Sequence, residues 1–203
     1  EKDRETVASF LKNNGYKTAC IGKWHLGLGW KAKDSLKPIV KYEWTKVFKK
    51  GDDSNVDYNK PVSGPNSLGF DYSYGHSGSL DMPPYVYVEN EKITGKINRI
   101  IEDKGEYSWF RKGPTAEDFI HDQVTPHFFK KAHEFIKEKH EENQPFFLYL
   151  PLPSPHTPIL PIEGWIGKSG LNEYADFVMQ IDHHVGELND LIEELNISEN
   201  TMI

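Results

Sequence analysis

Apolar residues recur every three or four positions in three stretches of the chain, which predicts three helices. The first covers residues 3–13, and Gly15 just after it is expected to be its C-cap residue. The second covers residues 116–142, where Pro126 restarts or kinks it. The third begins at Asn172. Its apolar stripe consists of Tyr174, Phe177, Val178, Ile181, Val185, Leu188, Ile192 and Leu195.

Short, continuous apolar runs predict the strands. Residues 17–21 and 146–150 are such runs, which are typical of strands buried on both faces. Residues 30–115 show no sustained period, so we expect long loops there, with short strands around 85–90 and 92–97. The closing Asn-Thr-Met-Ile predicts a further strand that is just beginning. Helices alternating with buried strands predict an α/β fold with a largely parallel sheet.

Composition restricts the class of protein. The chain has 203 residues, of which 37% are apolar and 13% aromatic, as is typical of a globular domain. A formal net charge of −7 without a long basic run argues against nucleic acid as a partner, although a locally positive pocket can still bind a small anion. The single cysteine, Cys20, excludes an internal disulfide and is expected to be buried. The sequence contains no apolar run that could span a membrane and no signal peptide.

Lys23 and His25 stand two positions apart, directly after the first predicted strand. Side chains two apart in an extended segment share a face, so both point one way and Trp24 points the other way. His156 follows the second predicted strand, and ligands of open α/β sheets bind outside the carboxyl ends of the strands. If the two strands are parallel and close, the three side chains converge. Taken singly, each is more often solvated or hydrogen-bonded, but together they suit an anion and a proton transfer.

Four blocks resemble the formylglycine-dependent sulfatases and occur in that family's order over residues 6–195. GYKTACIGKWHLG resembles the second sulfatase signature, G-Y-x-T-x-x-x-G-K-W-H-L-G, and LGFDYSYG resembles a G-F-D-x-x-x-G element. PFFLYLPLPSPHTP is similar to the strand and loop that carry H-T-P, and YADFVMQIDHHVGEL to a helix with a late D-x-x-V-G. SLDMPPYVYVEN resembles bacterial arylsulfatase-like members. The resemblance implies a partial alkaline-phosphatase-like fold, with a mostly parallel sheet, flanking helices and long loop insertions.

The resemblance also implies roles for individual residues. Lys23 would hold a sulfate oxygen, His25 would hydrogen-bond the formylglycine hydrate and help to expel sulfate, and His156 would protonate the leaving alcohol. These roles fit sulfate ester cleavage, in which charge develops on the sulfuryl and leaving oxygens. His76 and Asp81 follow the G-F-D element, where the family builds substrate contacts, and ordinary turn chemistry is the rival explanation for them.

The family's nucleophile motif, C/S-x-P/A-S-R, does not occur in this sequence, and neither do its paired aspartates, its later Asp-Asn-Gly or its later lysine. We therefore expect residues 1–203 to be the central part of a sulfatase catalytic domain, without metal ligands and inactive alone. The complete protein is expected to carry calcium and formylglycine and to hydrolyse aryl or carbohydrate sulfates. The family resemblance favours a periplasmic, extracellular or secreted location, and exposed strand edges of the chain favour self-association.

Two alternatives stay open: a phosphatase or phosphonate hydrolase of the same superfamily, and a non-catalytic binding protein on a sulfatase scaffold. The G-K-W-H-L-G motif favours a sulfatase over the first. A C/S-x-P/A-S-R motif upstream in the gene would support a sulfatase, and a lone Thr or Ser nucleophile would support a phosphatase.

Other candidate groups fit structural roles better. His183 and His184 are adjacent on a predicted helix and point about 100° apart, so joint metal ligation is awkward. Asp182 precedes them and is expected to be structural, and the Asp52-Asp53 pair is expected to be solvated. The Asn-Ile-Ser triplet at Asn196 is a glycosylation sequon, but such triplets are common.

Overall fold

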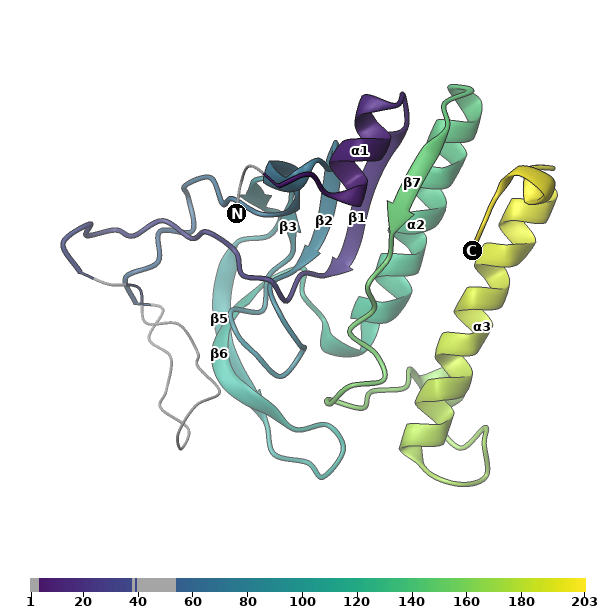
Figure 1. Cartoon of the computed structure of the whole chain (residues 1–203). Coiled ribbons are helices and arrows are strands. Elements are labelled where there is room, and N and C mark those ends of the chain that lie inside the picture. The colour runs from purple at the N-terminus through teal and green to yellow at the C-terminus, as the bar shows by residue number, and fades with distance from the viewer. Residues whose placement is uncertain (1–3, 38, 40–53) are drawn as a thin grey trace.

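A computed structural model describes residues 4–37, 39 and 54–203 of the chain (Figure 1). The strands are β1 (Lys17–Lys23), β2 (Tyr72–His76), β3 (Val88–Glu89), β4 (Lys92–Ile93), β5 (Ile97–Asp103), β6 (Phe110–Ala116) and β7 (Phe146–Tyr149). The helices are α1 (Val7–Asn13), α2 (Val124–Glu141) and α3 (Glu173–Glu194). Short 3-10 turns are η1 (Pro65–Leu68), η2 (His121–Gln123), η3 (Glu163–Trp165) and η4 (Ser198–Asn200).

Five strands form one sheet in the order β4-β3-β2-β1-β7. The central strand β1 runs parallel to both β2 and β7, with Lys23 opposite His76 and Lys17 opposite Phe146. The condition for the three side chains to converge, that the two strands are parallel and close, is therefore met. The arrowheads of these three strands point to one edge of the sheet (Figure 1). The sheet is mixed at its other end, because β3 pairs antiparallel with β2 and β4 antiparallel with β3.

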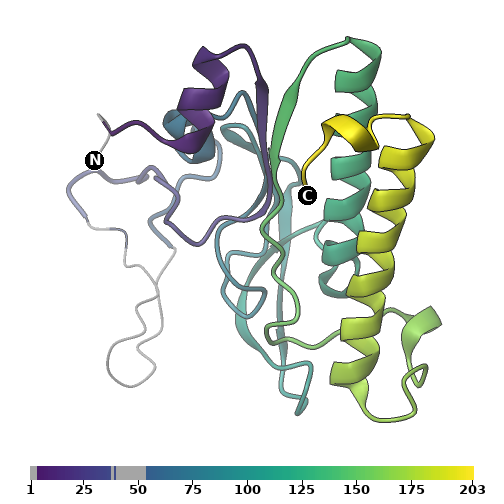
Figure 2. The same ribbon diagram turned by 45° about the vertical axis from the view of Figure 1, so that its right-hand side comes forward.

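Helices cover both faces of this sheet. Figure 2 shows α1 on one side of the central strands and α2 on the other, with α3 packed outside α2. Residues 18–22 of β1 are consecutively buried for this reason, which explains why the strand reads as an unbroken run rather than an alternation. Cys20 belongs to this run, and burial raises the pKa of its thiol to about 12, as befits an inert core residue. A second cluster joins α2 to α3 through Phe129, Ala132, Ile136, Leu188, Leu191 and Ile192.

The helix ends follow local sequence chemistry. Thr6 and Ser9 form a reciprocal capping box that starts α1. Asn172 caps α3 by accepting a hydrogen bond from the backbone N–H of Ala175. Pro126 is the third residue of α2, where an N–H has no intrahelical acceptor, so it belongs to the start of the helix. The predicted helix over 116–142 therefore begins too early, because its first residue ends β6.

Two further segments differ from the sequence-based expectation. The region expected to be loops with short strands contains β5 and β6, two strands of seven residues each. They pair with each other as an antiparallel ribbon. The strand expected at the end of the chain is wrong: η4 stands there, and Thr201 bonds back to Ile197 and Ser198 instead of pairing with a described strand. The Asp52-Asp53 pair lies outside the described residues.

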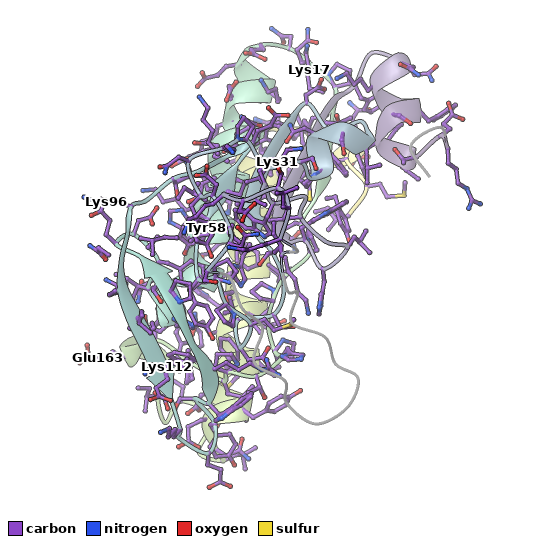
Figure 3. All side chains as sticks on the ribbon, turned by 90° about the vertical axis from the view of Figure 1, so that its left-hand side faces the viewer. Lys17, Lys31, Tyr58, Lys96, Lys112 and Glu163 are labelled. Carbon is purple, nitrogen blue, oxygen red and sulfur yellow. The ribbon has the colours of Figure 1, made fainter. Side chains whose placement is uncertain are left out.

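The carboxyl ends of the parallel strands face the ribbon. Figure 3 shows Lys17, at the start of β1, at the opposite end of the molecule from Lys112 of β6 and Glu163 of η3. The loops that follow β1, β2 and β7 therefore open toward the end of the molecule that carries the ribbon. No helix in the described part of the chain combines the length and the apolarity needed to cross a membrane.

Candidate active site

The end of β1 separates the two faces of the Lys-Trp-His sequence. Trp24 is 7% exposed and packs edge-on against Phe70, with ring centroids 6.4 Å apart. Lys23 is half-buried and His25 is exposed. The expected alternation is therefore present, with the tryptophan in the core and the two basic residues toward solvent.

Backbone hydrogen bonds tie this strand end to the loops on both sides. The N–H of Lys23 donates to the carbonyl of Pro151 at 2.7 Å, and the N–H of Trp24 donates to the carbonyl of His76 at 2.8 Å. Gly22 makes the first contact possible, because its φ is +134° and a Cβ at this position would lie 2.2 Å from the Pro151 oxygen. The glycine before Lys23 is thus required by a close backbone approach.

His156 lies in the loop that follows β7, and its side chain is exposed. Its Nδ1 is 2.6 Å from the carbonyl oxygen of Thr157. A carbonyl can only accept a hydrogen bond, so Nδ1 carries the proton and Nε2 remains available for proton exchange. The loop is also tied to the ribbon, since the N–H of Ile159 donates to the carbonyl of Tyr107 at 2.8 Å.

The pKa of His25 responds to the charges of the other predicted site residues. The protein around His25 removes part of its water, which lowers the pKa of His25 below its usual value, and the charge of Lys23 lowers it further. The Asp81 carboxylate opposes this shift, and His156 adds to it. Burial likewise lowers the pKa of Lys23, again against the field of Asp81. The charges of Lys23, Asp81 and His156 therefore all act on His25, and the His25 imidazole is neutral at pH 7.

Asp81 is buried and forms an ion pair with Arg111 of β6. The same Arg111 nitrogen also donates to the Asp81 carbonyl at 3.1 Å, and the guanidinium lies 5.1 Å from the Trp109 ring centroid. Within the described part of the chain, Asp81 Oδ1 and Ser79 Oγ are buried without hydrogen-bond partners. Sequence reasoning missed Arg111, because it stands thirty residues from Asp81 and lies in a ribbon that the sequence pattern does not predict.

His76 occupies a different position from the one expected of a substrate contact. Its ring is 1% exposed, with Nδ1 3.2 Å from the carbonyl oxygen of Val86 and Nε2 3.4 Å from that of Ser79. Burial lowers its pKa to about 4, so the ring is neutral at pH 7. A side chain enclosed in this way contacts protein, and His76 supports the loop of residues 77–81 from below the surface.

The remaining histidine pair lies on α3. Both side chains contact the Glu187 carboxylate: His183 Nε2 lies 3.4 Å from Oε1, and His184 Nδ1 lies 2.7 Å from Oε2. His183 lies on the helix surface as expected, whereas the side chain of His184 is only 12% exposed and its ring stacks on Phe129 of α2. Asp182 beside them is exposed. Across the residues that the structure describes, no three His, Cys, Asp or Glu side chains are grouped so as to hold a metal ion.

Comparison with known proteins gives this arrangement its context. A family model described as Sulfatase matches residues 1–203. The N-acetylgalactosamine-6-O-sulfatase of Bacteroides thetaiotaomicron is 29% identical over 238 residues, which cover 98% of this chain and 41% of that protein. The N-acetylgalactosamine-6-sulfatase of Canis lupus familiaris is 28% identical over 202 residues, which cover 99% of this chain and 32% of that protein. The chain thus spans about a third to two fifths of the length of these relatives.

Solved structures agree with the sequence comparison. A structure from work on the metabolism of multiple glycosaminoglycans by Bacteroides thetaiotaomicron superposes with a TM-score of 0.74 and 25% identity, covering 99% of this chain and 44% of that one. A sulfatase from Pseudoalteromonas sp. superposes with a TM-score of 0.63 at 20% identity, covering 98% of this chain and 36% of that one, which shows the shared fold alone. These neighbours have the alkaline-phosphatase-like fold. With the family model matching from the first residue to the last, the chain belongs to the sulfatase family.

Proposed function

We propose that residues 1–203 form the central part of the catalytic domain of an enzyme that hydrolyses sulfate monoesters. The observation that carries this proposal is the convergence of Lys23 and His156 on His25 at the carboxyl edge of the sheet. The relatives named above act on 6-sulfated N-acetylgalactosamine, and this favours a sulfated carbohydrate over an aryl sulfate as the substrate.

Lys23 supplies the fixed charge for the sulfate group. Its half-buried position weakens competition from water, so its ammonium interacts more strongly with a sulfuryl oxygen than a fully solvated lysine would. Negative charge on these oxygens changes during cleavage, and a preorganised cation stabilises that charge without reorganisation. The backbone bond to Pro151 fixes the strand end from which the side chain extends.

The two histidines divide the proton transfers. His156 holds one proton on Nδ1 against Thr157, so a second proton on Nε2 can pass to the leaving alcohol oxygen. His25 is neutral at pH 7 because burial and Lys23 lower its pKa, so it can accept a proton beside the sulfate. One histidine therefore acts as an acid and the other as a base at the same edge.

The complete protein is proposed to carry calcium and formylglycine and to be periplasmic, extracellular or secreted, as the family resemblance implies. The roles given above are those of this chain's own side chains. We further propose that the chain alone is inactive. A phosphatase or phosphonate hydrolase is the second candidate, because a lysine and two histidines also suit a phosphoryl group.

The test uses the complete protein and chromogenic sulfate and phosphate esters. Lys23→Ala and His156→Ala should each reduce sulfate ester turnover by about 100-fold or more, the usual scale for an oxyanion donor or a general acid. His156→Ala should hurt least with phenols that leave easily, since these hardly need the proton. Lys168→Ala and His140→Ala, away from β1 and its loops, are matched controls. Preferential cleavage of phosphate esters would replace the proposal with the phosphatase alternative.

A further inference from the structure

The Asp81 carboxylate opposes the lowering of the pKa of both Lys23 and His25. It stands in the loop after β2, and that loop passes close to His25, since a Cβ on Gly78 would lie 3.8 Å from the His25 ring. Asp81 Oδ2 is bonded to Arg111, whereas Oδ1 is buried and without a partner among the described residues. Among the described residues, only one of the two carboxylate oxygens of Asp81 therefore has a hydrogen-bond partner.

Burying this ion pair needs a reason other than stability. The Asp81 side chain is 3% exposed and that of Arg111 is 22% exposed, so the cost falls mainly on Asp81. Removing a charge from water costs several kcal/mol, and the attraction to a partner repays this only when the remaining hydrogen-bonding groups are satisfied. Asp81 Oδ1 is not satisfied within the described part of the chain. Replacing a buried ion pair by an apolar pair of similar volume is often neutral or stabilising, so we look for a use of the Asp81 charge in the site beside it.

The ribbon is well placed to hold the Asp81 carboxylate at a fixed position in the site. Arg111 fixes Asp81 in the loop after β2, and the carbonyl of Tyr107 receives the N–H of Ile159 in the loop after β7. The hairpin made of β5, β6 and the turn between them thus contacts both loops that complete the site around β1. A shift of the ribbon would move Asp81 and the His156 loop together.

We propose that Asp81 and Arg111 are a positioning pair of the anion site: Arg111 fixes the Asp81 carboxylate beside Lys23 and His25, and this negative charge counterbalances the crowded cationic groups there. Lys23 and His156 disfavour a second positive charge on His25, and an opposing carboxylate lets Lys23 stay charged and aimed at the sulfate. The charged or titratable groups facing Asp81 are Arg111, Lys23, His25 and the buried His76. The identity of the anion as a sulfate rests on the proposed function. The effect of the Asp81 and Arg111 charges on Lys23 and His25 does not depend on it.

The experiment follows His25 directly, in the complete protein labelled with 13C at histidine Cε1. The His25 signal is assigned by its loss in His25→Gln, and its chemical shift is titrated from pH 4.5 to 8.5. Asp81→Asn should move the His25 titration to lower pH, because the opposing negative charge is gone. Arg111→Gln should move it to higher pH, because Asp81 is no longer offset. Arg111→Lys keeps the charge and should restore most of the original titration.

Two control variants test whether the effect is local. Asp118→Asn removes a carboxylate whose field reaches Tyr74 and His127, so it should move the His127 titration and leave His25 unchanged. Lys112→Gln removes the neighbouring cation on β6, labelled in Figure 3, and should also leave His25 unchanged.

Opposite shifts in Asp81→Asn and Arg111→Gln support the pair, because unfolding would bring every histidine to its ordinary titration in both variants. An unmoved His25 signal in folded Asp81→Asn, or equal shifts in both variants, would overturn the proposal. If Asp81→Asn does not fold, the comparison of Arg111→Gln with Arg111→Lys decides alone. A protein that hydrolyses no sulfate ester but shows the opposite shifts would refute the proposed function and leave the pair standing.

Discussion

Replacing Gly22 by alanine should damage both the stability and the chemistry of the complete protein. Gly22 has a φ of +134°, and a Cβ there would lie 2.2 Å from the Pro151 oxygen and 3.0 Å from its carbon. These are backbone atoms, which cannot swing aside as the end of a flexible side chain can. The loop after β7 must therefore move away from β1 by roughly 1 Å to reach ordinary contact distance.

Two contributions set the magnitude. A non-glycine residue held in a sparsely populated backbone region costs about 1–3 kcal/mol. Moving Pro151 also breaks or stretches the 2.7 Å hydrogen bond from the N–H of Lys23, which costs about 1–3 kcal/mol at a partly buried strand end. The free energy of unfolding should therefore fall by about 2–6 kcal/mol. A displacement of 1 Å in a catalytic group also costs about 100-fold in rate, so turnover should fall by at least this factor.

Urea denaturation and sulfate ester turnover measure the two effects on the same preparations. Gly186→Ala is the matched control, because Gly186 lies inside α3 with open space around its Cβ position. That substitution should raise the free energy of unfolding by up to about 1 kcal/mol and leave turnover unchanged. A Gly22→Ala protein within 0.5 kcal/mol of the wild type would show that Pro151 moves freely, and the argument for a fixed strand end would fail.

Three further outcomes are expected in urea denaturation. Thr6→Ala removes the α1 cap and its bonds to Ser9, and should lower the free energy of unfolding by about 1 kcal/mol. Burial lowers the pKa of His76 to about 4 and that of His121 to about 3, so below about pH 6.5 the unfolded chain binds protons that the folded chain does not. Stability should thus fall as the pH drops from 6.5 to 4, and His76→Gln should make this fall shallower by about 1 kcal/mol per pH unit. Trp24→Ala empties a core position and should cost about 3–5 kcal/mol, with Trp165→Ala on η3 as the milder comparison.

The central strands could be predicted from the sequence because burial on both faces leaves a strong signal. Residues 18–22 are apolar or small without interruption, a pattern that is typical of strands covered by helices on both faces of a sheet. The parallel pairing of β1 with β7 then placed Lys23 and His156 at one edge by topology alone. These residues were accessible to sequence reasoning because each stands directly after a recognisable strand.

The ribbon could not be predicted, because its residues contradict strand rules. Gly113 and Pro114 stand inside β6, where glycine and proline usually mark a turn. Their reason is tertiary: a Cβ on Gly113 would lie 2.1 Å from Pro83, and the Pro114 carbonyl receives the N–H of Tyr85. Arg111 was missed with the ribbon that carries it. Contacts between distant segments, rather than local propensity, decide this part of the fold.

The same contacts explain how four separate segments hold one small site. The end of β1 bonds to the loop after β7 through Pro151 and to the end of β2 through His76. The loop after β2 carries Asp81, which pairs with the ribbon, and the ribbon bonds in turn to the loop after β7 at Ile159. The connections therefore close into a ring around the cationic groups. In a closed ring no loop can shift without straining two junctions, and this is how exposed side chains on loops keep the fixed geometry that charge stabilisation requires.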